Sequence, residues 1–160
     1  MYFNVSRLMK EPGGSRRAFR VDDELVVEAA EAQRVTGTAD LLRTDAGIWV
    51  SAALDAEVLS TCSRCLTECG QRIHMTIEEE FLPVADAETR ASVGGLDEAV
   101  GSSGIDQNNV LDLSEAVHQY YALNIPMKPV CRADCRGICL TCGADLNNSP
   151  CQCDNSARDT

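Results

Sequence analysis

Apolar and polar residues alternate along three successive segments in the first half of the chain. The segments run from Arg34 to Arg43, from Ile48 to Thr61 and from Arg72 to Leu82. The second is the most regular, and its alternate apolar positions are Ile48, Val50, Ala52, Leu54, Ala56 and Val58. A period of two is typical of strands with one buried and one solvated face, and turn-forming residues at 44–47 separate the first two segments. The pattern therefore predicts an antiparallel meander with one buried face and one solvent-exposed face.

The segments before and after this meander are less regular. Residues 2–9 predict a short first strand and Arg16–Val21 a second one, with a turn or loop at 11–15 between them. Residues 24–32 suit a strand or a short helix equally well. Residues 86–109 are mostly small or polar, with few large apolar side chains, and this composition predicts a mobile loop.

A helix is predicted after this loop. Asp112 is suited to cap its start, and Glu115 three residues later completes a capping box. Pro126 ends the helix, and residues 127–130 are expected to be extended because of the two prolines Pro126 and Pro129. The apolar stripe of the helix consists of Leu113, Ala116, Val117, Tyr120, Tyr121 and Leu123.

Nine cysteines are the strongest chemical signal in the chain. Six lie between Cys131 and Cys153 with the spacing C-x3-C-x3-C-x2-C-x8-C-x-C, and a separate CxxC stands in TCSRCLTECG. In a reducing compartment such closely spaced pairs indicate metal ligands before disulfides, and zinc favours four thiolates in a tetrahedron. We expect two zinc sites, one formed by Cys62, Cys65, Cys131 and Cys135 and the other by Cys139, Cys142, Cys151 and Cys153.

An alternative grouping is local. It joins Cys131, Cys135, Cys139 and Cys142 in one site and leaves Cys62, Cys65 and Cys69 without a fourth ligand. The first grouping is preferred because it uses eight thiols as four pairs. Cys69 is then left over, and an ordinary small buried residue is the favoured interpretation of it.

With these cysteines the predicted elements make an α+β fold. It consists of an antiparallel β meander or partial barrel, one main helix and a C-terminal cysteine-rich, zinc-binding appendage. We expect a β-rich domain over residues 1–130, with the mobile loop at about 86–109, a zinc-binding segment at 131–153 and a flexible tail at 154–160.

The net charge of the chain indicates which class of partner it can bind. With 25 acidic and 14 basic residues the formal net charge is −11. Proteins that bind nucleic acid through its phosphates need the opposite sign, so a basic protein partner is favoured over naked RNA. The simpler interpretation is that the acidity only keeps the protein soluble. No apolar run is long enough to span a membrane and the first residues do not form a signal peptide, so we expect a cytoplasmic protein.

No enzymatic site is predicted. His74 and His118 are expected at the surface, residues 78–80 alternate between two faces, and the chain lacks GxSxG, HExxH and P-loop motifs. Zinc sites made only of cysteines are usually closed and structural. A thioredoxin-type CxxC opens a helix, whereas CSRC follows a predicted strand. Two other hypotheses stay open: a redox-switched zinc chaperone, because CxC and CxxC thiolates can release metal when oxidised, and a thiol oxidoreductase.

The order of these motifs resembles a known family. The chain reads CSRCL, then EEEFLP, LDLSEAV and LNIPMKPVCRADCRGICLTCGADLN, and ends in CQC. This order resembles the YceD family of bacterial and plastid large-ribosomal-subunit rRNA accumulation proteins, which has no established enzymatic activity. The resemblance implies a non-enzymatic accessory factor that supports accumulation of large-subunit rRNA. The implied partner is a large-subunit ribosomal protein or an rRNA precursor, with no membrane and no small-molecule substrate. It also favours pairing Cys62 and Cys65 with Cys131 and Cys135.

Overall fold

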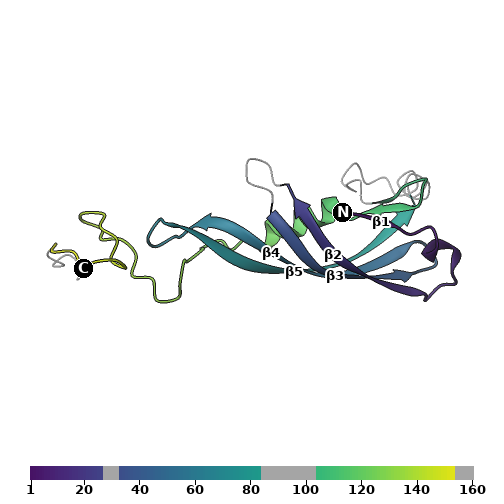
Figure 1. The fold of residues 1–160 in the computed structure, drawn as a ribbon, viewed down its shortest axis with the longest axis horizontal. Coiled ribbons are helices and arrows are strands. Elements are labelled where there is room, and N and C mark those ends of the chain that lie inside the picture. The colour runs from purple at the N-terminus through teal and green to yellow at the C-terminus, as the bar shows by residue number, and fades with distance from the viewer. Residues whose placement is uncertain (27–32, 84–103, 154–160) are drawn as a thin grey trace, which may run out of the picture. The chain divides into compact units, whose positions relative to one another are not determined.

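We describe the protein from a computed structural model, which covers residues 1–26, 33–83 and 104–153. The chain forms two compact units, Met1–Ala56 with Ile73–Ile125 and Glu57–Arg72 with Pro126–Thr160. We call them the sheet unit and the cysteine unit. Their elements are β1 (Tyr2–Asn4), η1 (Leu8–Lys10), β2 (Arg16–Leu25), β3 (Gln33–Arg43), β4 (Ile48–Thr61), β5 (Glu68–Pro83), β6 (Gly104–Ile105), β7 (Val110–Asp112) and α2 (Ser114–Asn124) (Figure 1).

The strands form one mixed sheet in the order β1-β7-β6-β5-β4-β3-β2. Strands β2 and β3 pair antiparallel over their whole length, with Arg16 opposite Leu42, and β3 pairs antiparallel with β4, with Leu42 opposite Trp49. The predicted meander is therefore confirmed, and the bounds of β4 agree with the sequence pattern. The sheet is not purely antiparallel as predicted, because the short strand β6 pairs parallel with the end of β5.

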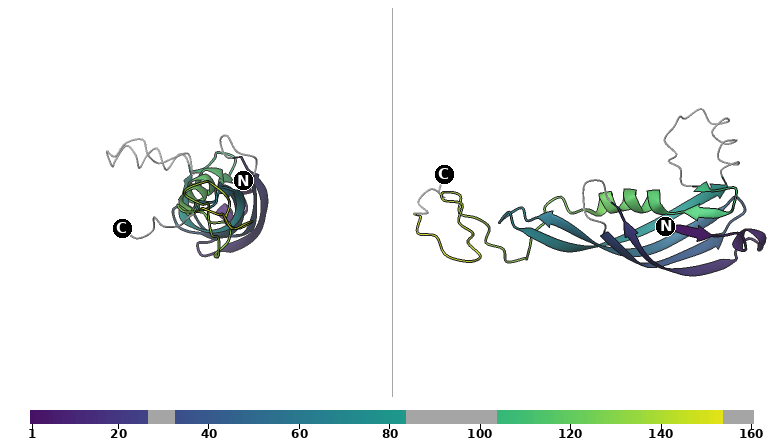
Figure 2. Two further views of the ribbon diagram at one scale, coloured as in Figure 1. Left: turned by 90° about the vertical axis from the view of Figure 1, so that its left-hand side faces the viewer. Right: turned by 45° about the horizontal axis from the view of Figure 1, so that its top comes forward.

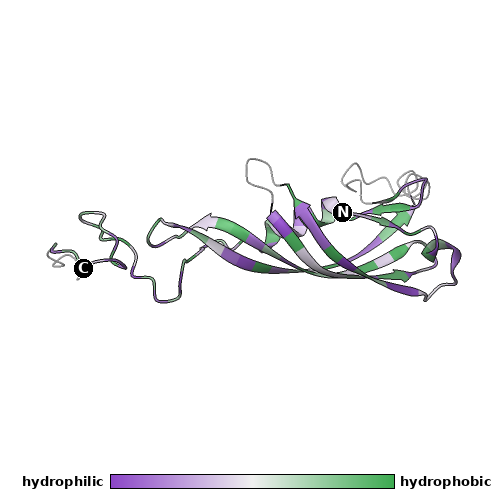
Figure 3. Cartoon of the chain, in the orientation of Figure 1, coloured by the Kyte–Doolittle hydropathy of each residue, from purple (hydrophilic) through white to green (hydrophobic). Residues whose placement is uncertain are grey.

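The buried face of the sheet carries the core, as the alternation predicts. Along β4 every apolar position from Ile48 to Val58 is buried while Trp49, Asp55 and Glu57 are exposed. Figure 3 shows the same alternation of hydrophilic and hydrophobic residues along the strands. The largest fully buried side chains of the unit include Phe81, Leu41, Ile48, Leu54, Met75 and Ile77.

Helix α2 covers this apolar face. The sheet curls around it, as Figure 2 shows in the view along the strands. The helix buries Ala116, Val117 and Tyr121, and Leu113 just before it is also inaccessible. Two predicted members of the stripe differ, because Leu123 is 80% exposed and Tyr120 is half-buried. The outer face of the curled sheet has no covering element among the described residues.

The predicted cap of the helix forms only in part. The Asp112 carboxylate accepts a hydrogen bond from the backbone N–H of Ser114 at 2.9 Å. The Glu115 carboxylate accepts a bond from the Gln119 side chain at 3.1 Å in place of the predicted capping box. Asp112 is also the last residue of β7 and pairs with Tyr2, so its backbone belongs to the sheet. Helix and sheet therefore meet without an intervening loop.

The N-terminal segment differs from the predicted strand over 2–9. Only Tyr2–Asn4 is extended, because the Asn4 side chain accepts a hydrogen bond from the backbone of Ser6 and turns the chain into η1. Phe3 and Phe19 nonetheless pack edge to face with ring centroids 5.3 Å apart. The turn buries Leu8 in the core.

Two predictions fall partly outside the described residues. Residues 27–32, part of the ambiguous segment 24–32, lie outside them, and β2 extends to Leu25. Of the predicted loop at 86–109, residues 86–103 lie outside them. The prediction is wrong for its last part, because β6 forms at Gly104–Ile105 and a tight turn held by the Asp106 carboxylate leads into β7. The tail at 154–160 also lies outside the described residues. Among the described residues, no helix combines the length and apolarity that crossing a membrane requires.

Candidate metal centres

The first CxxC forms a tight turn directly after β4. Cys62 follows the last strand residue, and its backbone N–H donates to the Thr67 carbonyl at 2.8 Å. The N–H of Leu66 donates back to the Cys62 carbonyl at 3.0 Å, and the N–H of Arg64 points at the Cys62 sulfur at 3.4 Å. Backbone N–H groups directed at a cysteine sulfur stabilise its thiolate, which is the form that binds metal.

The second CxxC repeats this turn. The N–H of Gly143 donates to the Cys139 carbonyl at 2.8 Å, and the N–H of Cys139 donates to the Ala144 carbonyl at 2.8 Å. The residue after each second cysteine has left-handed backbone angles, with φ of +61° at Leu66 and +72° at Gly143. Two stretches with different sequences therefore adopt one backbone geometry, and each presents two sulfurs to the same side.

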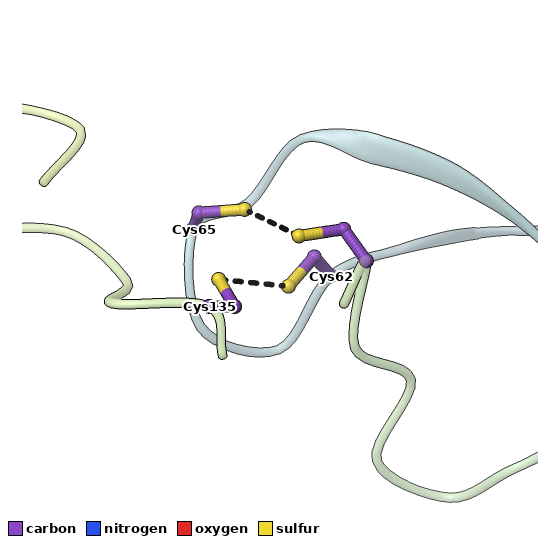
Figure 4. Close-up of side chains that lie close together, drawn as sticks. Cys62, Cys65 and Cys135 are labelled. Atoms are coloured by element: carbon purple, nitrogen blue, oxygen red, sulfur yellow. Dashed lines mark hydrogen bonds between the residues drawn. The ribbon is translucent and has the colours of Figure 1, made fainter. Parts of the chain in front are cut away.

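The structure brings Cys62, Cys65, Cys131 and Cys135 together, and we call this group site one. Their four sulfurs lie within 4.8 Å of one another. The Sγ atoms of Cys62 and Cys135 are 3.9 Å apart (Figure 4). Those of Cys65 and Cys131 are 3.6 Å apart. Four thiolates at the usual Zn–S distance in a tetrahedron have S···S edges of about 3.8 Å, whereas a disulfide needs about 2.05 Å. The spacing fits a tetrahedral metal ion.

The remaining pairs meet in site two. The sulfurs of Cys139, Cys142, Cys151 and Cys153 also lie within 4.8 Å of one another. These are the groups that the paired-thiol hypothesis preferred, and all nine cysteines are free thiols. The sites differ in burial. In site one only Cys131 is exposed, while in site two only Cys139 is buried.

The hydrogen bonds at each turn shift the pKa values of the thiols apart. Backbone N–H groups, first that of Cys65, lower the pKa of Cys62 to about 6, and those of Cys142 and Thr141 lower the pKa of Cys139 to about 6. Loss of hydration and the neighbouring Cys135 raise the pKa of Cys131 to about 12, and the neighbouring Cys142, followed by loss of hydration, raises that of Cys153 to about 12. In site one the hydroxyl and the backbone of Thr67 lower the pKa of Cys65 as well. A cation at the centre of each site would favour the thiolate form of Cys131 and Cys153.

Side chains that the sequence analysis missed hold site one in place. The Arg64 guanidinium donates to the carbonyl oxygens of Ala133 and Cys135, at 3.3 and 3.0 Å. The Gln71 amide donates to the Val130 carbonyl at 2.7 Å, and the Asn147 amide donates to the Cys135 sulfur at 3.4 Å. Such outer contacts orient metal ligands. The position of Arg64 inside the CSRC motif was the one local signal for its role.

The other candidate residues lie away from the sulfurs. Cys69 is half-buried and packs against the Cys62, Cys65 and Cys135 cluster without joining it. His74 is exposed as predicted, and its Nδ1 lies 3.1 Å from an Asp55 oxygen. His118 is half-buried on α2, and residues 78–80 alternate between faces as predicted.

We call each tight CxxC turn a knuckle, and we expect the residue after its second cysteine to control the stability of the turn. Leu66→Gly should remove the left-handed strain of a side-chain-bearing residue, about 1 kcal/mol, and Gly143→Ala should introduce a similar strain. An added Cβ at Gly143 would meet no atom within 4 Å, so only backbone conformation changes. Metal competition with a chromophoric chelator should show tighter metal binding in Leu66→Gly and weaker binding in Gly143→Ala. The same direction in both variants would contradict a shared knuckle geometry.

Acid should remove metal from both sites. The free thiolates of Cys62 and Cys139 form above pH 6 and are lost as the pH falls through 6. Protons then compete with the metal, so retention should be complete at pH 7.5 and lost near pH 5. Metal counting after dialysis across this range measures the effect. Retention that does not change between these values would contradict thiolate ligation.

The net charge is distributed unevenly over the two units. Counted over the full sequence, the segments Glu57–Arg72 and Pro126–Thr160 hold six acidic and six basic residues. The remaining segments hold 19 acidic and eight basic residues, so the formal charge of −11 lies entirely on the sheet unit.

Comparison with known proteins identifies related chains. Residues 50–160 match the family model described as large ribosomal RNA subunit accumulation protein YceD. An uncharacterized protein of Mycobacterium tuberculosis, Rv2926c, is 28% identical over 106 residues, which is 65% of this chain and 47% of the relative. A protein of Zea mays named large ribosomal RNA subunit accumulation protein YCED homolog 1, chloroplastic, is 43% identical over 44 residues, 27% of this chain and 15% of the relative. The chain thus spans less than half the length of these relatives. No solved structure matches it.

Proposed function

Because the chain belongs to the YceD family of large ribosomal RNA subunit accumulation proteins, we propose that it is a non-enzymatic accessory factor in large-subunit assembly. The match to residues 50–160 carries the proposal. It includes most of β4, all of β5 and α2 and every cysteine of both candidate sites. The family description names accumulation of ribosomal RNA and no chemical reaction. We also propose that the protein acts in the cytoplasm.

The cysteine unit is proposed to bind two structural zinc ions. In each site four thiolates would fill the tetrahedron and leave no position for a water or a substrate, as in structural zinc centres. Zinc would supply binding energy that folds the segment from Pro126 to Cys153 onto the hairpin tip. The hydrogen bonds of Arg64 and Gln71 to this segment support this arrangement.

We expect two zinc ions per chain. The reason is that eight of the nine thiols gather in two groups of four. Elemental analysis of untagged protein, purified without chelator, measures the content. One equivalent would contradict the second site, and a metal-free, folded protein would contradict both.

The partner proposed is a basic large-subunit ribosomal protein, free or on an rRNA precursor. The charge of the sheet unit supports a basic partner, because a surface of this sign repels phosphate and attracts Lys and Arg. Affinity purification of the tagged protein from cells, followed by identification of bound protein and RNA, tests the function. Recovery of large-subunit proteins with precursor rRNA is expected. Recovery of neither, under conditions that preserve assembly intermediates, would overturn the proposal.

A redox-switched zinc chaperone is a second candidate, and the exposure of site two favours it. Cys142 is exposed and Cys151 and Cys153 are half-buried, so three thiols of site two are open to an oxidant, whereas in site one only Cys131 is. Zinc release by mild peroxide together with a gain of holdase activity would support this function. A thiol oxidoreductase is less favoured, because the low-pKa thiol of Cys62 is fully buried.

A further inference from the structure

The outer face of the sheet unit carries the only tryptophan of the chain. Trp49 lies near the start of β4 and is 37% exposed. Its neighbour directly across on β3 is Leu42, which is half-buried. No element among the described residues covers this face, because α2 packs on the opposite side of the sheet (Figure 2). An aromatic side chain is therefore presented on an otherwise polar surface.

Carboxylates surround this side chain. Asp40 lies two residues from Leu42 on the same face of β3 and pairs across the ladder with Ser51. Glu80 lies beside the turn that leads into β4, because its carboxylate accepts a hydrogen bond from the Thr44 hydroxyl at 2.6 Å. Glu78 is two residues away on the same face of β5 and is exposed.

Cations are absent from the centre of this face. The outward-facing positions within Thr36–Leu42, Trp49–Asp55 and His74–Glu80 hold four carboxylates and no Lys or Arg. The flanking cations of the ladder are Arg43 at the end of β3, whose guanidinium donates to the Gly47 carbonyl, and two residues of the edge strand β2, where Arg16 lies across from Leu42 and Arg20 across from Thr38. The charge at the centre of the face is thus uniformly negative.

We propose that this face, formed by Asp40, Leu42, Trp49, Glu78 and Glu80, is a docking surface for an arginine-rich segment of a partner protein. The inference rests on the proposed function and assigns a surface to its basic partner. A guanidinium group stacks on an indole ring and pairs with carboxylates through planar, paired hydrogen bonds. Lysine satisfies the charge but not the stacking geometry, and the phosphates of RNA are repelled by the same carboxylates.

The single tryptophan allows a direct test with the purified, metal-loaded full chain. Three probes are titrated: an arginine-rich peptide of about 15 residues, a lysine-rich peptide of equal length and charge, and a single-stranded RNA of similar length. We expect the arginine peptide to change the tryptophan emission and to bind about tenfold more tightly than the lysine peptide. Stronger quenching by RNA than by either peptide would overturn the proposal.

Matched variants distinguish the contribution of this face to peptide binding from the contribution of the net charge of the protein. Calorimetry with the arginine peptide should show about tenfold weaker binding for Glu78→Gln/Glu80→Gln, and less than a twofold change for Glu24→Gln/Glu115→Gln, which removes equal charge elsewhere. Trp49→Thr should abolish the preference for arginine, while Tyr2→Thr, which removes an aromatic that is 73% exposed on β1, should keep it. Trp49→Leu, which keeps an apolar side chain on the strand but removes the ring, replaces Trp49→Thr if that variant does not fold, and it should abolish the preference for arginine likewise. Equal losses in the test and control variants would overturn the assignment.

The outcome for this surface is distinct from the outcome for the proposed function. If affinity purification recovers large-subunit precursors equally well with wild-type protein and with Glu78→Gln/Glu80→Gln, the function stands and the docking surface is wrong. If the variant recovers fewer precursors while Glu24→Gln/Glu115→Gln recovers them normally, both stand. If wild-type protein recovers none, the function fails, whatever the peptides show.

Discussion

Replacing Cys62 by serine is expected to lower the melting temperature by about 10 °C or more, a larger loss than Cys151→Ser causes. Site one joins Cys65 to Cys131 across a loop of some 65 residues, and the cross-link estimate for such a closure is about 4 kcal/mol. A domain of this size has only about 5–15 kcal/mol in total. Site two closes a short segment from Cys139 to Cys153, so Cys151→Ser should loosen mainly that segment.

Thermal melts of Cys62→Ser, Cys131→Ser and Cys151→Ser, with zinc counted in each, measure this difference. Cys69→Ser is the matched control, since Cys69 packs against site one without belonging to either group. It should melt within about 2 °C of the wild type, as expected for a small change outside the ligand set. If Cys151→Ser unfolds the protein while Cys62→Ser stays folded with metal on Cys131, the local grouping of cysteines is correct instead.

Gly47→Ala is expected to destabilise the sheet by about 2–3 kcal/mol, because the added carbon has no room. A Cβ built on Gly47 would lie 2.1 Å from the Phe81 carbonyl oxygen and 3.0 Å from its carbon, both on the backbone of β5. Neither atom can move unless the strand shifts. Equilibrium unfolding in urea measures the loss of free energy.

Gly70→Ala provides the control for this steric argument. Its Cβ would meet the Glu57 carboxylate at 2.2 Å, which is the far end of a flexible side chain that can turn away. We expect a loss below about 1 kcal/mol. Similar losses at Gly47 and Gly70 would show that chain entropy, and not the contact with Phe81, determines the effect.

Much of the sheet could be predicted from the sequence, because burial on one face imposes a period of two. The bounds of β4 agree to the residue, and the face assignment holds along β3, β4 and β5. The strands β6 and β7 could not be predicted, because they have two and three residues and depend on pairing with β5 and β1. A strand that short has no periodicity of its own.

Pair counting predicted a grouping of the cysteines, whereas the contacts around the sulfurs could not be predicted from the sequence. Spacing indicates which thiols can share a knuckle, and the structure joins Cys62 and Cys65 with Cys131 and Cys135. The roles of Arg64 and Gln71 depend on carbonyl groups more than 55 residues away in the chain. The left-handed backbone at Leu66 could not be predicted from the sequence either, because leucine rarely takes left-handed angles.

The separation between the two halves of site one has a consequence for synthesis on the ribosome. The knuckle of Cys62 and Cys65 leaves the exit tunnel 66 residues before Cys131. At usual elongation rates this interval lasts about 3–13 s. During it the nascent chain presents two thiols with an incomplete set of ligands, which metal or oxidant can reach. Site two is translated within 15 residues, from Cys139 to Cys153, so its ligands emerge almost together. If site one binds metal as proposed, Cys62 and Cys65 can therefore complete their ligand set only after the C-terminal segment has been synthesised.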